Sequence, residues 1–273
     1  MRISIIIPCF KAIETLERAV SSIMAQTIFS QHSRHVPEII LAADDHDNYA
    51  GINTICKNVK IVPPVKGRIA TGPGATRNRG IHVSSGDFLG FLDADDEWSE
   101  EYLEELLPLA RLHGAAFAPT AVFNHGGDHL ITLGHRQNVL RPSDFGHWPG
   151  SFHPLVHRRL THGFTDGAGQ DVFHALDVLG LVGGQAPMAK TALYKLHLKD
   201  SSVTADPGFS RNIARRYRAH IHAYRKGHTS LFGMARIQAM QALYRRQWWN
   251  HAWLDAGSGK DGFYGFVAGR KII

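Results

Sequence analysis

Three carboxylates follow directly after the apolar segment at residues 88–92. Asp93, Asp95 and Asp96 lie within four residues of one another. Carboxylates crowded at a strand end raise one another's pKa values, so folding stability gives no reason for them. A divalent cation would offset the repulsion, because Mg²⁺ and Mn²⁺ take hard oxygen ligands. The pattern indicates a site for Mn²⁺ or Mg²⁺ and substrate phosphates; the alternative is a polar turn in which Asp96 caps the next helix.

A second acidic pair ends another apolar segment. Residues 38–43 are typical of a buried strand and lead into Asp44 and Asp45. Arg77 lies between the two acidic segments, on a predicted helix whose first residues, 72–74, include glycines that permit close approach of a phosphate or sugar. Ligands of open α/β sheets bind beyond the carboxyl ends of the strands. We therefore expect a nucleotide site at which one carboxylate contacts the base or ribose and another holds a metal.

A third acidic segment contains Asp171, which follows the glycine-rich residues 163–169 and begins an amphipathic helix marked by Val172, Leu176 and Leu179. Two interpretations are open from sequence spacing. Asp171 is either the N-cap of that helix or a carboxylate held on a loop that faces the metal site.

Strand and helix patterns alternate over the first 115 residues, which predicts an α/β fold with a parallel sheet and right-handed crossovers. Helices are expected at 13–24, from Gly72 to near Gly86, and after Ser99, where Pro108 should kink or end the helix. The predicted strands lie at residues 3–8, 38–43, 59–62 and 88–92, and shorter ones at 116–118 and 130–133.

Composition restricts the class of protein. The 273 residues are 44% apolar and have no low-complexity tract, so the chain is globular. Two cysteines, Cys9 and Cys56, are too few for a disulfide framework and favour a reducing compartment. The N-terminus lacks the apolar core of a signal peptide, and no apolar run reaches the length of a membrane span. These features predict a cytoplasmic protein.

The positive charge is concentrated in the tail. Residues 209–273 contain 12 Lys/Arg and 2 Asp/Glu, although the whole chain carries only +6. Two helices are predicted there, with apolar positions at Ile213, Tyr217, Ile221 and Tyr224, and at Met240, Leu243, Tyr244 and Trp248. Basic amphipathic helices with Trp suit an anionic membrane surface. The alternative, which we favour slightly, is that the stripes pack on the rest of the chain or on a second subunit.

The histidines raise the question of a zinc site. His153 and His157 are four residues apart, and His162 lies nearby. No H-E-x-x-H motif and no cysteine pair accompanies them, which argues against zinc. Because these histidines precede Asp171, we expect them to line a substrate-binding side of the site.

The charge distribution argues against a nucleic-acid-binding module. The excess of basic residues is confined to the tail, and the sequence contains no known nucleic-acid-recognition motif.

Four segments together resemble the inverting glycosyltransferases of family 2, which have the GT-A fold. They are SIIIPCFKAIETLERAVSSIMAQT, EIILAADD, GPGATRNRGIHVSSGDFLGFLDADDEW and the GQD that precedes a helix. Their order and spacing agree with the family over about residues 1–200. Three positions depart from the family pattern: Lys11 replaces an Asn, Gln170 replaces a Glu, and residues 46–48 replace a Gly-Ser turn.

The resemblance implies a Rossmann-like, mostly parallel sheet with helices on both faces and a C-terminal helical extension. Residues 1–205 would form the GT-A catalytic domain, with a nucleotide-binding half at 1–115 and an acceptor half at 116–205, and residues 206–273 the helical tail. The resemblance assigns three roles by position. Nucleotide-sugar binding is expected of Pro8, Phe10, Asp45, Arg77 and Asp93. Metal binding is expected of Asp95, Asp96 and His197, and general-base catalysis of Asp171.

The implied activity is metal-dependent transfer of a sugar from a nucleotide-sugar, expected to be a UDP-sugar, to an acceptor hydroxyl by a single inverting displacement. The acceptor would be a glycan or a lipid-linked glycan in surface polysaccharide synthesis. The basic tail would then hold the protein on the inner face of the plasma membrane or form a homodimer. A sugar nucleotidyltransferase is the nearest rival, and the GQD loop argues against it. An inactive scaffold is the other rival, and Asp93, Asp95 and Asp171 argue against it.

Overall fold

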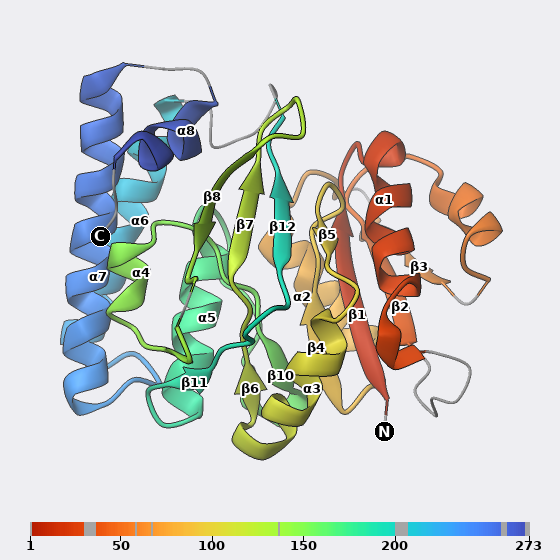
Figure 1. Ribbon diagram of the computed structural model, residues 1–273, viewed down its shortest axis with the longest axis horizontal. Helices are drawn as coiled ribbons and strands as arrows, with labels where there is room; N and C mark the ends of the chain where they lie inside the picture. Colours follow the sequence, from red (N-terminus) through yellow and green to blue (C-terminus); the bar gives the residue numbers. More distant parts are fainter. Residues whose placement is uncertain are drawn as a thin grey trace.

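A six-stranded sheet forms the centre of the computed structural model (Figure 1). The structure describes residues 2–29, 37–57, 59–66, 68–135, 137–199, 207–257 and 261–270. The strand order across the sheet is β3 (Val59–Val62), β2 (Pro37–Ala43), β1 (Ile3–Cys9), β4 (Phe88–Phe91), β10 (Leu155–His157) and β6 (Ala115–Ala116). The first four strands are parallel, whereas β10 runs antiparallel to both of its neighbours. The sheet is therefore mixed and mostly parallel, as expected.

Both faces of the sheet are covered, because β1 is apolar on both sides. Ile5 and Ile7 pack with Leu16 and Leu103, which come from the helices α1 (Ile13–Met24) and α3 (Tyr102–His113). Ile6 points to the opposite face, where α2 (Pro73–Val83) and α5 (Gln170–Leu181) lie. Parallel strands therefore present their carboxyl ends between two helical layers.

The helix α3 corrects one expectation. It passes through Pro108 and continues to His113, where Gly114 ends it in the left-handed conformation. An end at Pro108 is therefore excluded. Buried side chains on both sides of the proline, including Leu106 and Ala110, hold the helix against the sheet and outweigh the one backbone hydrogen bond that proline removes.

A second sheet lies beside the acidic strand end. Its strand order is β5 (Glu97–Trp98), β12 (Tyr194–His197), β7 (Thr120–Phe123) and β8 (His129–Leu133). The strand β12 pairs antiparallel with β5 and parallel with β7. Because β5 directly follows Asp96, this pairing places β12 against the three carboxylates. The remaining short elements are β9 (Val139–Leu140) paired with β11 (Ala186–Pro187), α4 (Asp144–His147), and the 3-10 helices Thr27–Phe29, Tyr49–Thr54 and Arg158–Leu160.

The tail forms three helices along one side of the molecule, drawn in cyan to blue in Figure 1: α6 (Pro207–Arg225), α7 (Gly233–Ala256) and α8 (Gly262–Gly269). Tyr217 and Ile221 of α6 and Leu243 of α7 belong to the same apolar core as Phe91 and Leu176. The apolar stripe of α6 therefore packs on the rest of the chain. Within the described ranges, none of the helices combines the length and the hydropathy that crossing a membrane requires.

Candidate functional site

The acidic strand end is fixed by β12. The Tyr194 hydroxyl donates to Asp96 Oδ2 at 2.9 Å and accepts from the Asp93 backbone N–H at 3.1 Å. The His197 backbone N–H donates to Asp96 Oδ1 at 2.9 Å. Burial, followed by the charges of Asp95 and Asp93, raises the pKa of Asp96 well above its ordinary value. The interpretation of Asp96 as a helix cap is wrong, because its carboxylate binds β12 and the next helix begins at Tyr102.

Asp95 is the most accessible of the three carboxylates. Its side chain is 40% exposed, and Lys199 Nζ lies 3.2 Å from Asp95 Oδ2. Arg18 donates to the Asp95 carbonyl and so holds the loop from the side of α1. The structure thus separates two neighbouring acids, a buried and bonded Asp96 and an outward-facing Asp95.

Arg77 joins the acidic strand end to α2. It forms an ion pair with Asp93, and its guanidinium lies 5.2 Å from the centre of the Phe164 ring. The side chain is buried, and its Nε and Nη1 atoms have no hydrogen-bond partner among the described residues. Leaving buried donors unpaired is costly. The unpaired donors therefore suit an anionic ligand beside Asp93.

Asp171 lies in the first turn of α5, one residue beyond its start. The N-cap is Gly169, which adopts a left-handed conformation with φ 77°, so the N-cap interpretation of Asp171 is wrong. The Asp171 carboxylate instead accepts a hydrogen bond from the Ser151 hydroxyl. Burial alone would raise the pKa of Asp171, but His153, the Ser151 hydroxyl and Arg77 together hold it below its ordinary value. Asp171 is therefore ionised at neutral pH.

His153 lies between the two acidic regions. Its Nε2 is 3.8 Å from Asp93 Oδ2, and Asp171 also acts on its ring electrostatically. Burial, together with Arg77, lowers the pKa of His153 and favours the neutral ring. Asp93 contacts both His153 and Arg77, and Asp171, 78 positions further along the chain, acts on His153 through its charge.

From the sequence, His153 was expected only to line a substrate-binding side of the site, and Ser151 was not identified. A signal was present: Ser151 and His153 are two residues apart just before β10, and such spacing places two side chains on one face of an extended segment. The other two histidines lie apart. His157 packs edge-on against Phe88, and His162 is exposed beside Asp177. In the described part of the chain, no three His, Cys, Asp or Glu side chains form a metal-binding group on their own.

The loops after β1 and β2 meet at Asp45. The Asp45 carboxylate accepts from the Lys11 backbone N–H and from the Tyr49 hydroxyl, the latter at 2.8 Å. Phe10 beside it is 49% exposed, and Pro8 is half-buried. The predicted base-pocket residues therefore lie at the carboxyl ends of adjacent strands. Asp44 has a structural partner instead, because it accepts from the Gly72 backbone N–H and fixes the start of α2.

The His197 side chain points toward Glu97. Its Nε2 lies 3.3 Å from Glu97 Oε1, and its ring stacks on Phe123 with the centroids 5.4 Å apart. Only its backbone N–H contacts Asp96. Its role as a metal ligand stays a prediction.

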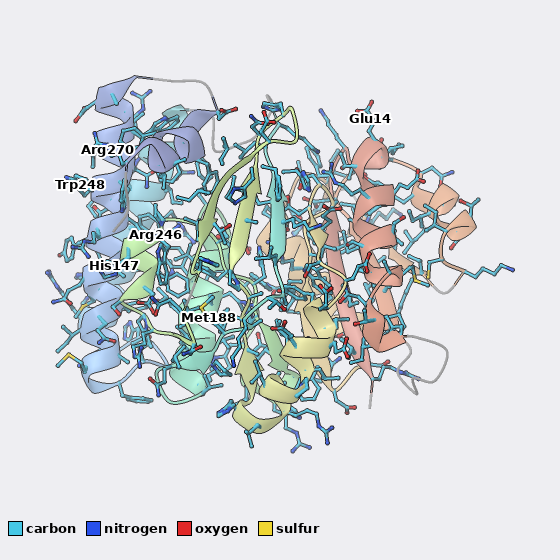
Figure 2. All side chains as sticks on the ribbon, viewed as in Figure 1. Glu14, His147, Met188, Arg246, Trp248 and Arg270 are labelled. Atoms are coloured by element: carbon cyan, nitrogen blue, oxygen red, sulfur yellow. The ribbon has the colours of Figure 1, made fainter. Side chains whose placement is uncertain are left out.

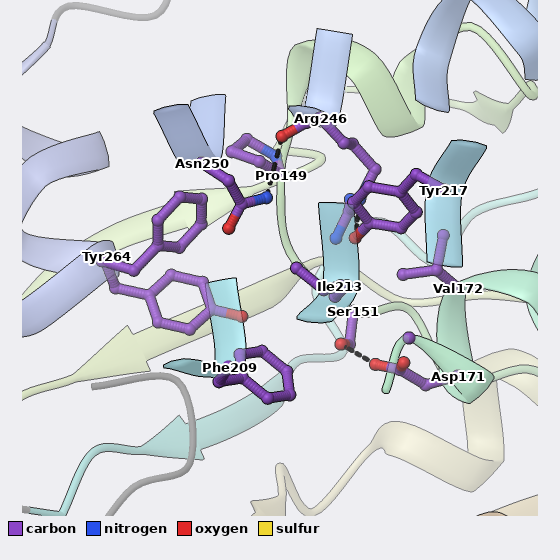
Figure 3. Close-up of a pocket in the computed structure, with 12 residues that line it drawn as sticks. Pro149, Ser151, Asp171, Val172, Phe209, Ile213, Tyr217, Arg246, Asn250 and Tyr264 are labelled. Atoms are coloured by element: carbon purple, nitrogen blue, oxygen red, sulfur yellow. Dashed lines mark hydrogen bonds between the residues drawn. The ribbon is translucent and has the colours of Figure 1, made fainter. Parts of the chain in front are cut away.

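A pocket opens on the side of Asp171 that faces the tail. It has a volume of about 520 Å³ including its open mouth. Asp171 and Ser151 lie on one side of it, and Arg246 of α7 and Tyr264 of α8 lie on the other (Figure 3). Burial raises the pKa of the Tyr264 phenol, and the charged groups that act on it are Arg246, Asp171 and Asp96. The pocket thus lies beside Asp171.

Residues 4–170 match the family model described as Glycosyl transferase family 2. The match covers more than half of the chain, and the protein belongs to this family. The resemblance found in the four sequence segments is confirmed.

Curated relatives are bacterial glycosyltransferases. The chain is 30% identical over 155 residues to the amylovoran biosynthesis glycosyltransferase AmsB of Erwinia amylovora, covering 52% of this chain and 43% of AmsB. It is 25% identical over 115 residues to the UDP-Glc:alpha-D-GlcNAc-diphosphoundecaprenol beta-1,3-glucosyltransferase WfgD of Escherichia coli, covering 42% of this chain and 43% of WfgD. The chain spans less than half of the length of these relatives.

Solved structures share the fold. S. aureus TarS 1-349 in complex with UDP-GlcNAc superposes with a TM-score of 0.68 at 14% identity, covering 91% of this chain and 73% of that one. The mannosyltransferase PcManGT from Pyrobaculum calidifontis, in complex with GDP-Man and Mn2+, gives a TM-score of 0.57 at 14% identity, covering 98% and 78%. The predicted GT-A architecture with C-terminal helices is confirmed.

Proposed function

We propose that the protein is a metal-dependent glycosyltransferase that moves a sugar from a nucleotide-sugar to an acceptor hydroxyl in bacterial surface glycan synthesis. The observation that carries the proposal is the convergence of Asp93 and Asp171 on His153 and Arg77, in a chain of glycosyl transferase family 2. Asp93 follows a strand end suited to a diphosphate and a cation, and Asp171 lines a pocket.

The donor is a uridine diphosphate sugar. Phe10 offers an exposed ring for a base, and Asp45 lies beside it as an acceptor for a base or ribose N–H or O–H. Arg77 supplies unpaired N–H groups for the diphosphate. TarS has been solved with UDP-GlcNAc, and WfgD is named for UDP-Glc, which favours uridine over guanosine.

The acidic strand end fits a divalent cation. Mg²⁺ and Mn²⁺ are commonly held by one or two carboxylates together with substrate phosphates, so a complete protein cage is not required. Asp95 would be the exposed ligand of such a cation, with Asp93 facing the donor beside it. Asp96 is hydrogen-bonded to β12 and would help the cation site by holding the loop that carries Asp95. The His197 side chain would have to move away from Glu97 to reach a cation. A bound cation would neutralise charge on the departing diphosphate.

Asp171 acts as the general base. It removes the proton from the acceptor hydroxyl while that oxygen bonds to the anomeric carbon and the bond from this carbon to the diphosphate oxygen breaks. A single displacement from the opposite face inverts the anomeric centre. Ser151 holds the Asp171 carboxylate in place, and the lowered pKa keeps it ionised and able to accept the proton.

Donor turnover tests this proposal directly. We expect the purified protein with Mn²⁺ to release UDP from UDP-glucose or UDP-N-acetylglucosamine in the presence of a glycan acceptor, and thorough chelation to abolish the release. The measurement is chromatographic separation of UDP, UMP and pyrophosphate. Pyrophosphate formation from UTP and a sugar phosphate would instead identify a nucleotidyltransferase, and full activity after chelation would remove the role of the metal.

The outer face of α7 suits an anionic lipid surface, which would bring the enzyme to a lipid-linked acceptor. Residues 207–254 contain nine Lys/Arg and no Asp or Glu. Tyr244 and Trp248 are 47% and 52% exposed, and Arg270 lies over the Trp248 ring at 6.0 Å (Figure 2). We define the basic aromatic face as Met234, Ile237, Tyr244, Trp248 and Arg270. Arg270 and also Arg225, which lies over the Tyr244 ring at 5.9 Å, supply positive charge beside the exposed rings, and this combination matches an interfacial contact with anionic headgroups.

A further inference from the structure

The three tail helices form one wall of the pocket that contains Asp171, and we infer that this wall is the binding site for the ring of an acceptor sugar. The inference rests on the proposed glycosyltransferase function. It adds the chemical class of the group that is bound and the residues that bind it.

The pocket has a catalytic side and a tail side. Ser151, Asp171 and Val172 come from the body of the protein. The tail side consists of Phe209, Ile213 and Tyr217 of α6, Arg246 and Asn250 of α7, and Phe263 and Tyr264 of α8. Figure 3 shows Phe209 and Tyr264 next to each other across the pocket from Arg246. An acceptor bound between the two sides would lie against the carboxylate that takes its proton.

The lining has the chemistry of a carbohydrate site. Aromatic rings give a flat apolar surface on which the C–H face of a pyranose packs, and the polar side chains nearby bond to its hydroxyls. Phe209 and Tyr264 supply the rings, and Asn250 and Ser151 supply polar groups beside them.

Arg246 fixes the tail wall to the catalytic side. It is 5% exposed, its Nε donates to the Tyr217 hydroxyl at 2.8 Å, and its Nη1 donates to the Gly150 carbonyl at 2.9 Å and the Phe145 carbonyl at 3.1 Å. Within the described residues, no carboxylate lies at ion-pair distance from it. Gly150 directly precedes Ser151, which bonds to Asp171. Arg246 is therefore a positioning residue that ties α6 and α7 to the segment that holds the base.

The position of this wall in the chain separates it from the nucleotide half. The family match ends at residue 170, one residue before Asp171, so every tail residue of the pocket lies beyond it. The donor-side residues from Pro8 to Asp96 lie within the match. The proposed sugar-binding residues of α6, α7 and α8 therefore lie outside the segment that matches the family model.

Binding of simple glycosides tests the inference without requiring turnover. We propose saturation-transfer difference NMR with the methyl β-glycosides of glucose, galactose, N-acetylglucosamine and mannose, each added to the full-length protein with UDP and Mn²⁺. At least one glycoside should give ring-proton signals. Phe209→Ala and Tyr264→Ala should each weaken its Kd about tenfold, equivalent to about 1.4 kcal/mol, whereas Tyr264→Phe should stay within about twofold.

Phe232→Ala is the matched control, because Phe232 has the same side chain as Phe209, lies at the start of α7 and is 77% exposed. It should bind the glycoside like the wild type. Phe209 is only partly buried, so its variant is expected to fold even if Tyr264→Ala does not. Absence of signal for all four glycosides, or equal affinity in Phe209→Ala and the wild type, would overturn the inference. Glycoside binding without any donor turnover would instead remove the proposed function and leave the sugar site standing.

Discussion

Identical side chains in this protein differ in chemistry because their neighbours differ. Asp96 is buried beside two other carboxylates, which raises its pKa, whereas Asp171 has His153, Ser151 and Arg77 around it, which lower its pKa. The sequence identified both regions as acidic, and it left Asp171 open as either a helix N-cap or a carboxylate that faces the metal site. It did not reveal that His153 lies between Asp93 and Asp171, because that contact depends on how segments 60 positions apart pack together.

A buried histidine next to this cluster gives a prediction on pH and stability. Burial, with His153 and Arg77 nearby, lowers the pKa of His174 to about 3, and the unfolded value is about 6.5. Between these values the unfolded chain binds a proton that the folded chain does not, so the stability contributed by neutral His174 falls as the pH falls. From pH 7 to 5, the wild type should lose about 2 kcal/mol more than His174→Gln. Urea unfolding of both proteins at the two pH values measures the difference; equal losses would contradict it.

The elements that were predicted well are those with a strong local pattern. The four parallel strands and the first helices occur at the expected residues because apolar repeats specify them locally. The strands β10 and β12 were missed. Each is only three or four residues long, and β12 is defined by pairing with β5, which is almost 100 residues earlier. Pairing over that distance leaves no periodic signal, although β12 is the element that fixes Asp93 and Asp96.

The packing of α2 against the glycine-rich loop gives a prediction for an element. A Cβ on Gly74 would lie 2.4 Å from the Thr165 carbonyl oxygen, so Gly74→Ala must push away the loop that leads to Asp171. We expect a loss of about 1–3 kcal/mol in the free energy of unfolding, despite the better helix propensity of alanine, together with a lower kcat for transfer.

Gly51→Ala is the control for that variant, because a Cβ at Gly51 meets no atom within 4 Å and its φ needs no glycine. Thermal unfolding and steady-state transfer rates should leave Gly51→Ala close to the wild type. A Gly74→Ala protein as stable and as active as Gly51→Ala would show that the loop tolerates displacement.

At the scale of the whole molecule, the tail has a buried inner face and an exposed outer face. Its inner face shares the main apolar core and completes the pocket at Asp171, while the outer face of α7 keeps Tyr244 and Trp248 exposed. From the sequence, Leu243, Tyr244 and Trp248 were placed in one apolar stripe that was expected to pack, but only Leu243 is buried, and Tyr244 and Trp248 are exposed. That division depends on which side of α7 meets α4 and α6, and the weak amphipathic pattern of α7 does not specify it.

The basic aromatic face gives a prediction for the intact protein. The protein should float with vesicles that contain phosphatidylglycerol and cardiolipin. It should remain unbound with vesicles of phosphatidylcholine alone, because the attraction is to negative headgroups. Trp248→Ser with Arg270→Glu should reduce flotation while the circular dichroism spectrum is retained. Equal flotation with neutral vesicles would argue against the electrostatic contact, and a concentration-dependent dimer that the same variant disrupts would assign the face to a second copy.

The most direct test of the central claim, that two distant acidic regions act on one donor–acceptor pair, is a comparison of wild type and Asp171→Asn in two assays on the same preparation. Calorimetry with UDP and Mn²⁺ should give the same Kd for both proteins, because Asp171 lies outside the donor half. Sugar transfer should fall about 10²–10⁴-fold in the variant, the usual contribution of a general base. Transfer at the wild-type rate by Asp171→Asn, with nucleotide binding intact, would contradict the account.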